Sequence, residues 1–208
     1  MPDERLHLAG EHVELVPLAP DHVDELVAAA TIDRSSYGFT DVPGDAEHMA
    51  AYVANLLAKR RAGTDLPFAQ RRRVDGRLVG CTRYLDIRRW RGRAEPDEVE
   101  IGGTWLAADV QRTALNTEAK MLLLTHAFET WHVDRVAIAT DARNARSRQA
   151  IERIGARFEG VLRHHRPSMA PGEAGRARDT ALFAITDDEW PDVRRDLEQR
   201  LGMTYGRG

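Results

Sequence analysis

A run of polar residues at the start of a buried helix is the first candidate for chemistry. It extends from Gln111 to Thr117 and follows a predicted strand that ends at Leu106. The N-terminus of a helix presents unpaired N–H groups and the positive end of the helix dipole, which together bind phosphate. Arg112 and the hydroxyl groups of Thr113 and Thr117 would add donors. Taken alone, the same pattern is also typical of an ordinary helix start.

Asn144 and Ser147, three residues apart at the start of the next predicted helix, form a second candidate. Asn is a common N-cap residue and Ser is common in the first turn. By itself, therefore, the pair predicts the capping of a helix, and a ligand-binding role needs further support.

Other reactive residues carry less weight. Cys81 lies in a predicted strand without an activating neighbour, so we expect a buried, inert thiol. His164 and His165 are adjacent in sequence and would point to opposite faces of a strand, which argues against joint metal binding. Tyr84 could line a cleft, but a packing role is favoured. The chain contains no Gly-x-x-x-x-Gly-Lys-Ser/Thr loop, which argues against a nucleotide-triphosphate enzyme.

Hydrophobic periodicity and turn signals predict the elements that must position these residues. The predicted strands span residues 12–18, 67–73, 78–87, 98–106, 133–140, 158–163 and 180–185. The predicted helices span residues 20–30, 45–62, 117–131, 145–154 and 187–201, with Asp21 as the N-cap of the first. Asp75-Gly76 is a hairpin turn signal, whereas residues 98–140 read as one βαβ unit. We therefore predict an α+β fold with a mixed, mostly antiparallel central sheet flanked by helices, in a single domain over residues 1–208.

The overall composition excludes several classes of protein. The 208 residues include 30 Lys and Arg against 33 Asp and Glu, which gives a net charge of −3 and no reason to expect nucleic acid as the main partner. No apolar run is long enough to span a membrane, and the N-terminus does not resemble a secretory signal. The single cysteine excludes a disulfide framework and a cysteine-based zinc site. We expect a reduced, cytoplasmic location.

Three segments together point to a known family. Asn144-x-x-Ser147 heads a helix that closes with Ile154-Gly155-Ala156-Arg157-Phe158-Glu159-Gly160, and the sequence Asp187-Asp188-Glu189-Trp190-Pro191 follows near the C-terminus. In these features the chain resembles the GNAT superfamily of N-acetyltransferases, in its RimJ/RimL-like branch. The resemblance covers roughly residues 10–200 and is strongest over residues 98–163.

One departure from the family pattern concerns the phosphate-binding turn. The family pattern is Gln/Arg-x-x-Gly-x-Gly/Ala, in which Gln111 matches but Ala114 and Asn116 occupy the two glycine positions. Glycine lets phosphate approach the backbone closely. Ala is only slightly larger, and Asn brings an amide donor of its own. We therefore expect acetyl-CoA binding to survive, with Asn116 near a phosphate.

The resemblance implies direct transfer of an acetyl group from acetyl-CoA to an amine, without a metal. The attacking amine must be neutral, so a nearby base would help. Glu100 is our candidate for that base, acting through water, because the family uses this strand to line the acceptor cleft. An exposed carboxylate paired with one of the many arginines is an equally weighted alternative for Glu100, and Glu98 is the second candidate.

The remaining roles also follow from the resemblance. Backbone N–H groups near Leu106 would stabilise the thioester oxygen, and Ser147 would donate a hydrogen bond to the departing thiolate. Asn144 would bind the amide of the cofactor or the incoming amine. The cofactor-binding residues implied are Leu106, Gln111, Arg112, Thr113, Ala114, Asn116, Thr117, Asn144 and Ser147.

Two questions stay open at the level of sequence. The acceptor is either a protein N-terminal α-amine or a small-molecule amine, and the loops around residues 31–48 and 164–178 would decide between them. The two missing glycines also motivate a second function, a non-catalytic CoA-binding sensor or interaction module. Acetyl-CoA and an amine are thus the expected partners, no membrane is expected, and a homodimer is compatible with the resemblance.

Overall fold

The computed structural model describes residues 5–202 and contains one eight-stranded sheet. Its strands are β1 (Leu8–Ala9), β2 (Val13–Pro17), β3 (Leu66–Arg72), β4 (Leu78–Arg88), β5 (Glu98–Leu106), β6 (Arg135–Asp141), β7 (Arg157–Pro167) and β8 (Ala177–Thr186). They lie in the order β1-β2-β3-β4-β5-β6-β8-β7, and β5–β6 is the parallel pair among otherwise antiparallel neighbours. The predicted mixed, mostly antiparallel sheet is confirmed.

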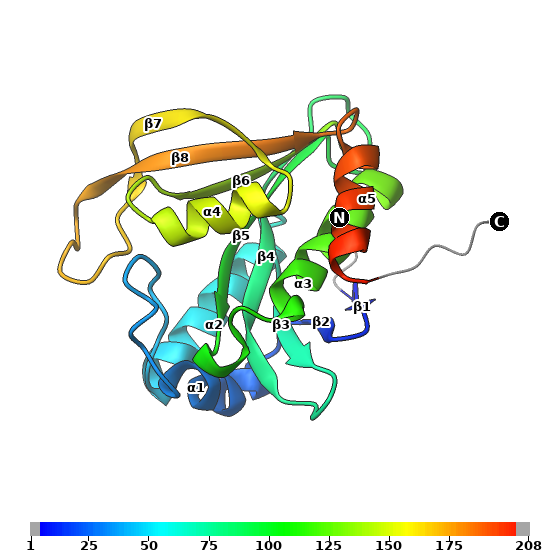
Figure 1. Ribbon diagram of the computed structural model, residues 1–208. Coiled ribbons are helices and arrows are strands. Elements are labelled where there is room, and N and C mark those ends of the chain that lie inside the picture. The colour runs from blue at the N-terminus through cyan, green and yellow to red at the C-terminus, as the bar shows by residue number, and fades with distance from the viewer. Residues whose placement is uncertain (1–4, 203–208) are drawn as a thin grey trace.

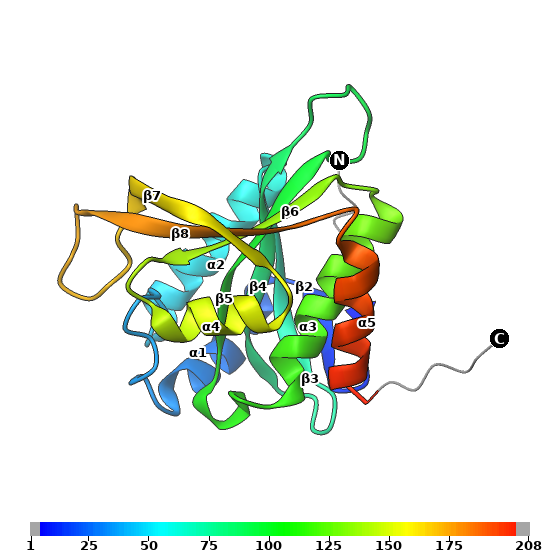
Figure 2. The same cartoon turned by 45° about the horizontal axis from the view of Figure 1, so that its top comes forward.

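Five α-helices flank this sheet. They are α1 (Val23–Thr31), α2 (Ala46–Arg61), α3 (Ala114–Thr125), α4 (Ala145–Arg153) and α5 (Trp190–Arg200). In Figure 1, α1 and α2 lie together beside β3 and β4, whereas α4 lies along β6 and β8. Figure 2 shows α5 running alongside α3, which it contacts. The crossover from β5 through α3 to β6 is the predicted βαβ unit.

Several helix boundaries differ from the prediction. Helix α3 ends at Thr125 and continues as a π-helical turn over His126–Thr130, and α5 begins at Trp190 rather than at residue 187. Helix α3 begins at Ala114 rather than at residue 117, because the Thr113 hydroxyl caps it by accepting from the Leu115 N–H at 3.3 Å. The predicted N-cap Asp21 is wrong. It lies in a 3-10 turn that precedes α1, where the Ala19 N–H instead donates to His22 Nδ1 at 3.2 Å.

The strands at the edge of the sheet also depart from the prediction. β7 runs from 157 to 167, several residues beyond the predicted end at 163, and β1 was not predicted. Strand β7 is the edge strand and most of its residues are exposed, so hydrophobic alternation does not mark its extent. The ladder between β7 and β8 shifts register between Leu162 and Arg166. Strand β7 then continues to Pro167 through polar residues.

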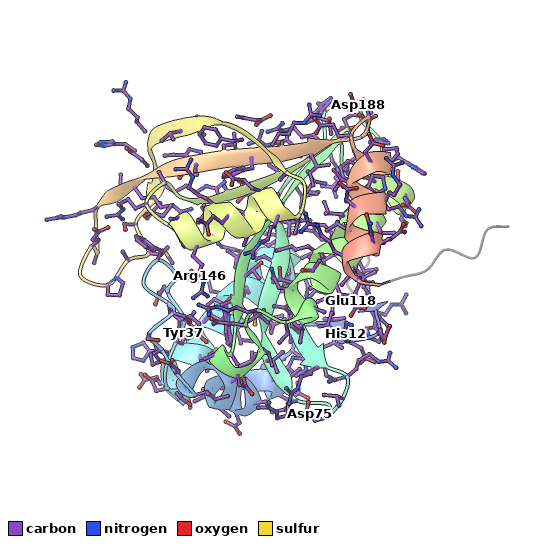
Figure 3. All side chains as sticks on the ribbon, in the orientation of Figure 1. His12, Tyr37, Asp75, Glu118, Arg146 and Asp188 are labelled. Atoms are coloured by element: carbon purple, nitrogen blue, oxygen red, sulfur yellow. The ribbon has the colours of Figure 1, made fainter. Side chains whose placement is uncertain are left out.

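Helix α3 is fixed at both of its ends. Near its start, the buried Glu118 carboxylate accepts from the backbone N–H groups of Glu11, His12 and Val13 at 2.7–2.8 Å, so the β1–β2 turn closes on it (Figure 3). Near its end, the buried Tyr84 hydroxyl donates to the Leu123 carbonyl at 2.6 Å. Three backbone donors on one carboxylate make a strong local anchor. Helix α3 is therefore held firmly against β2 and β4.

Candidate active site

The β5–β6 pair opens partway along its length. The parallel ladder joins residues 98–100 of β5 to residues 135–137 of β6 and then stops. Beyond this point β5 continues to Leu106 while β6 continues to Asp141 in register with β8. Figure 1 shows β6, β7 and β8 turning away from β3, β4 and β5. Backbone groups of β5 that would face β6 are thereby left for another partner, because every backbone N–H and C=O needs one.

A bulge in β5 lies beside this opening. On its other edge β5 pairs with β4, and the register shifts between Cys81 and Arg83. Gly103 has a φ of 56°, a left-handed conformation that glycine adopts at little cost. A Cβ atom there would also lie 2.2 Å from Arg83 Nη1. The bulge therefore depends on glycine, and it changes which β5 groups face the opening.

Gln111 links the end of β5 to two other segments. Its Nε2 atom donates to the Leu106 carbonyl at 2.8 Å and to Ser36 Oγ at 2.9 Å, and its Oε1 atom accepts from Arg146 Nη2 at 2.9 Å. The Tyr37 hydroxyl donates to the same Leu106 carbonyl at 3.0 Å. Figure 3 shows Arg146 and Tyr37 on the same side of the molecule. The structure thus brings the predicted residues Leu106 and Gln111 together.

The turn before α3 has the form of an anion-binding helix start. Arg112 has a φ of 64°, which is unusual for a residue with a side chain and turns the backbone sharply into the helix. Thr113 is the N-cap, and its hydroxyl also donates to the Val110 carbonyl at 2.8 Å. Ala114, Asn116 and Thr117 then lie in the first turn of α3, where backbone N–H groups lack partners within the helix.

Asn144 is the N-cap of α4, as its sequence position predicts. Its Oδ1 atom accepts from the Ser147 N–H at 3.0 Å. The structure therefore confirms capping for Asn144. Among residues 5–202, the Ser147 hydroxyl makes no hydrogen bond to another side chain or backbone group, so the hydroxyl remains available to a ligand.

The structure places Glu100 in an ion pair. Only 5% of the residue is exposed, and its two carboxylate oxygens accept from Arg166 Nη1 and Nη2 at 2.8 and 2.7 Å. Arg166 also donates to Asp86 Oδ2 at 2.6 Å. The arginine partner foreseen in the alternative interpretation is therefore present, but the carboxylate is buried rather than exposed. Glu98, the second candidate, pairs with Arg88 and Arg135.

A second arginine network, which the sequence did not predict, joins three segments around the start of α4. Arg143 donates through Nε and Nη2 to Asp141 at 2.9 and 2.8 Å, and through Nη1 and Nη2 to Glu173 at 2.8 and 2.9 Å. Its guanidinium also lies 5.3 Å from the centre of the Phe39 ring. Hydrogen bonding to Arg143 lowers the pKa of Asp141, and Arg143 together with Ser168 lowers that of Glu173 to about 2.

The contacts of Arg143 with Glu173 and Phe39 have no local signal in the sequence. Asp141 and Arg143 are neighbours, but Glu173 and Phe39 come from distant loops. The run Asp141-Ala142-Arg143 before Asn144 was the one available signal, and nothing in it indicates that Arg143 spans both loops.

Cys81 and Tyr84 behave as packing residues, whereas His164 is exposed on β7. Cys81 is buried, and burial raises the pKa of its thiol to about 12, which makes it the inert thiol that we predicted. Tyr84 is fully buried, in agreement with its predicted packing role. His164 has a φ of 48°, and its N–H donates to Asp179 Oδ1 at 2.9 Å.

Over residues 5–202 no three His, Cys, Asp or Glu side chains are grouped to hold a metal ion. In the same residues no helix has the length and apolar character needed to cross a membrane.

A hollow of about 530 Å³ lies on one side of the α3 start. The β1–β2 and β3–β4 turns and the residues around Thr113 and Ala114 line it. Neither Glu100 nor Ser147 borders it. The hollow is therefore separate from the opening between β5 and β6.

Comparison with known proteins agrees with this geometry. Residues 12–157 match the model of the acetyltransferase (GNAT) domain. The chain is 28% identical over 160 residues to YdaF of Bacillus subtilis strain 168, provisionally named a ribosomal N-acetyltransferase, which covers 74% of this chain and 82% of YdaF.

Solved structures share the fold along most of the chain. A GCN5-related N-acetyltransferase from Brucella melitensis has a TM-score of 0.80 at 27% identity, covering 94% of this chain and 85% of that one. Mycobacterium smegmatis RimJ, in complex with CoA-disulfide, has a TM-score of 0.73 at 23% identity, covering 92% of this chain and 90% of that one, and this likeness is one of fold. With a family model matched over most of its length, the chain belongs to the GNAT family and is an N-acetyltransferase.

Proposed function

We propose that the chain transfers the acetyl group of acetyl-CoA to a primary amine by direct attack of the amine on the thioester. The observation that carries this proposal is the position of the β5–β6 opening. The ladder ends at Glu100, and the starts of α3 and α4 are linked across the end of β5 by Gln111 and Arg146. The site thus combines a free strand edge, a helix N-terminus suited to phosphate and an available serine hydroxyl.

The residues of this chain fit acetyl-CoA on these grounds. The N–H groups of the first turn of α3, with Thr113, Asn116 and Thr117, would hold its phosphates, and the free edge of β5 near Leu106 would bind the extended arm and the thioester oxygen. Acetyl-CoA supplies an acetyl group that is activated as a thioester. Ser147 would donate a hydrogen bond to the sulfur as it leaves, since a thiol of ordinary pKa is a moderate leaving group.

Removal of the proton from the amine needs a base, and Glu100, the candidate, is already paired with Arg166. We propose that Glu100 serves through a water molecule while Arg166 fixes its orientation. Glu100→Gln should then lower turnover at pH 7 by about 10²-fold or more, and the deficit should shrink as rising pH deprotonates the amine.

Two acceptor classes follow from the relatives. The name of YdaF, a ribosomal N-acetyltransferase, favours a protein amine such as an N-terminal α-amine, and a small-molecule amine is the alternative. A non-catalytic CoA sensor is a second candidate function, favoured by Ala114 and Asn116 at the glycine positions and by the paired state of Glu100.

Calorimetry with acetyl-CoA, followed by thiol release with a mixed panel of peptides and small amines, separates these functions. Binding together with thiol release on an α-amine or a small amine supports the transferase. Binding without turnover on any amine supports the sensor, and no binding contradicts both.

A further inference from the structure

Two polar side chains on β8 lack partners on the acceptor face of the sheet. Arg178 is half-buried, and its Nε atom is buried without a hydrogen-bond partner. Thr180 is fully buried, and its Oγ1 atom also has no partner among the described residues. A buried polar group without a partner is costly, so native proteins rarely retain one without a reason.

The register of the sheet places both side chains on the face that carries Glu100. Directly paired residues share a face, and side chains alternate along a strand. Glu100 pairs with Ala137, which pairs with Ala184, and the β6–β8 ladder has no register shift along its length. Thr180 and Arg178 lie four and six residues from Ala184 on β8, and so on the same face.

Arg178 also lies directly across the ladder from Arg166, the residue that holds Glu100. Two arginines at paired positions repel each other unless anions intervene. Arg166 has two carboxylates, Glu100 and Asp86, whereas no ion pair involving Arg178 is formed among residues 5–202.

The other arginine on this face is likewise occupied. Arg143 fills its donors with Asp141 and Glu173. Asp141 and Glu100, the carboxylates whose charges act on Arg178, therefore already serve another guanidinium, and burial lowers the pKa of Arg178. Its Nε donor is desolvated and lacks an acceptor, and neither Nη1 nor Nη2 is hydrogen-bonded among residues 5–202, which leaves the guanidinium available to a ligand oxygen.

We propose that Arg178 and the hydroxyl of Thr180 form a subsite for a carboxylate carried by the amine acceptor. This inference rests on the proposed transferase function. A guanidinium is planar and matches a carboxylate with two parallel hydrogen bonds, and the neighbouring hydroxyl supplies a further donor. The carboxylate is either the side chain of an acidic residue near a peptide N-terminus or the α-carboxylate of a free amino acid.

Acceptors that differ only by a carboxylate test the subsite. One pair consists of peptides that begin with Asp or with Asn, and the other of a free amino acid and its carboxamide. We expect wild-type kcat/KM to be at least about tenfold higher for the carboxylate member of one pair. The pair that shows this preference identifies whether the carboxylate belongs to a peptide side chain or to a free amino acid. Arg178→Gln should reduce this preference to within about twofold, while the KM for acetyl-CoA stays within about twofold. Arg178→Lys should retain part of the preference.

Thr180→Val gives an independent test, because valine has nearly the shape of threonine. Removal of an unpartnered buried hydroxyl should leave the melting temperature unchanged or raised. The same change should lower kcat/KM several-fold for the carboxylate acceptor alone. Arg157→Gln is the control, since Arg157 is an exposed arginine on β7 that pairs with Glu189, and it should leave the preference intact.

Several outcomes would overturn the subsite. They are equal wild-type rates within both acceptor pairs, an equal loss on both members in Arg178→Gln, or a Thr180→Val variant that is destabilised without loss of the preference. Turnover of the amide acceptors establishes the transferase independently of the subsite. If no amine of any kind is acetylated, the proposed function itself fails.

Discussion

The cofactor side and the acceptor side of the β5–β6 opening are built in different ways. On the cofactor side, the starts of α3 and α4 are capped by contacts over two or three residues, such as Thr113 with Leu115 and Asn144 with Ser147. The side chain of Gln111 adds longer-range hydrogen bonds to Ser36 and Arg146. On the acceptor side, Arg143 holds Glu173 as well as the nearby Asp141, and Arg166 holds Glu100 and Asp86. Apart from Asp141, these carboxylates lie 30 to 80 residues away in the sequence. Backbone and hydroxyl groups therefore prepare the first region, and long-range ion pairs shape the second.

This difference explains what each region can do. Backbone donors at a helix N-terminus suit a ligand that is always the same, such as the phosphates of CoA. Side-chain networks between loops can change without altering the sheet, and loops commonly carry specificity for that reason. We therefore expect cofactor binding and acceptor binding to respond separately to substitution.

The sharpest test on the cofactor side is Ser147→Ala. We expect turnover to fall by about 10²-fold or more, because a positioned proton donor contributes that much. The affinity for acetyl-CoA should change by less than about threefold, since the Asn144 cap uses the backbone N–H of residue 147, which the substitution retains. Single-turnover rates and calorimetry measure the two quantities, and equal losses in both would remove Ser147 from the catalytic residues.

The sequence predicted the start of α4 and its Asn144 cap on the cofactor side, because these signals are local. Helix α3 begins at Ala114, three residues before the predicted start at Thr117, because Thr113 is its N-cap. The fold class followed from strand periodicity and from the single βαβ unit. The acceptor side could not be predicted in the same way, because no local pattern specifies that Arg166 reaches Glu100 across 66 residues.

A buried lysine on α3 differs from the paired charges of the acceptor side. Lys120 Nζ donates to Thr104 Oγ1 at 2.7 Å, and no carboxylate lies within ion-pair distance in residues 5–202. Burial lowers its pKa to about 7. Between pH 7 and about 10.4 the unfolded chain holds this proton and the folded chain does not, so the lysine destabilises the fold less as pH rises.

Lys120→Met should therefore stabilise the protein by about 2 kcal/mol at pH 7, because it removes the cost of burying this amine. The advantage over wild type should shrink towards zero by pH 10. Urea unfolding of both proteins at pH 7, 8.5 and 10 measures the difference, in which the effects of other titrating groups cancel. A stability difference that is constant with pH would show that Lys120 keeps its charge.

On the acceptor side, Arg143→Met should release the loop at residues 168–176 and the segment around Phe39 together. We expect the KM for the acceptor to rise about tenfold, which corresponds to about 1.4 kcal/mol, while the KM for acetyl-CoA stays within about twofold. Amide hydrogen exchange across 168–176 should accelerate. Arg195→Met removes an exposed ion pair with Asp192 on α5 and is the matched control. Equal rises in both KM values would mean that the two sides are coupled.

The smallest effect is expected where the chain departs from the family pattern. Asn116 is the third residue of α3, and Asn116→Gly restores the glycine of the phosphate-binding turn. Closer approach of phosphate to the backbone should strengthen acetyl-CoA binding, whereas loss of the amide donor should weaken it. Glycine within a helix also lowers helix stability by up to about 0.5 kcal/mol relative to asparagine. We therefore expect less than a threefold change in affinity by calorimetry, with Asn116→Ala separating loss of the amide from gain of space. A tenfold gain in affinity for acetyl-CoA in Asn116→Gly alone would show that the wild-type side chain limits cofactor binding. Affinity on the cofactor side would then depend on a side chain as well as on backbone groups.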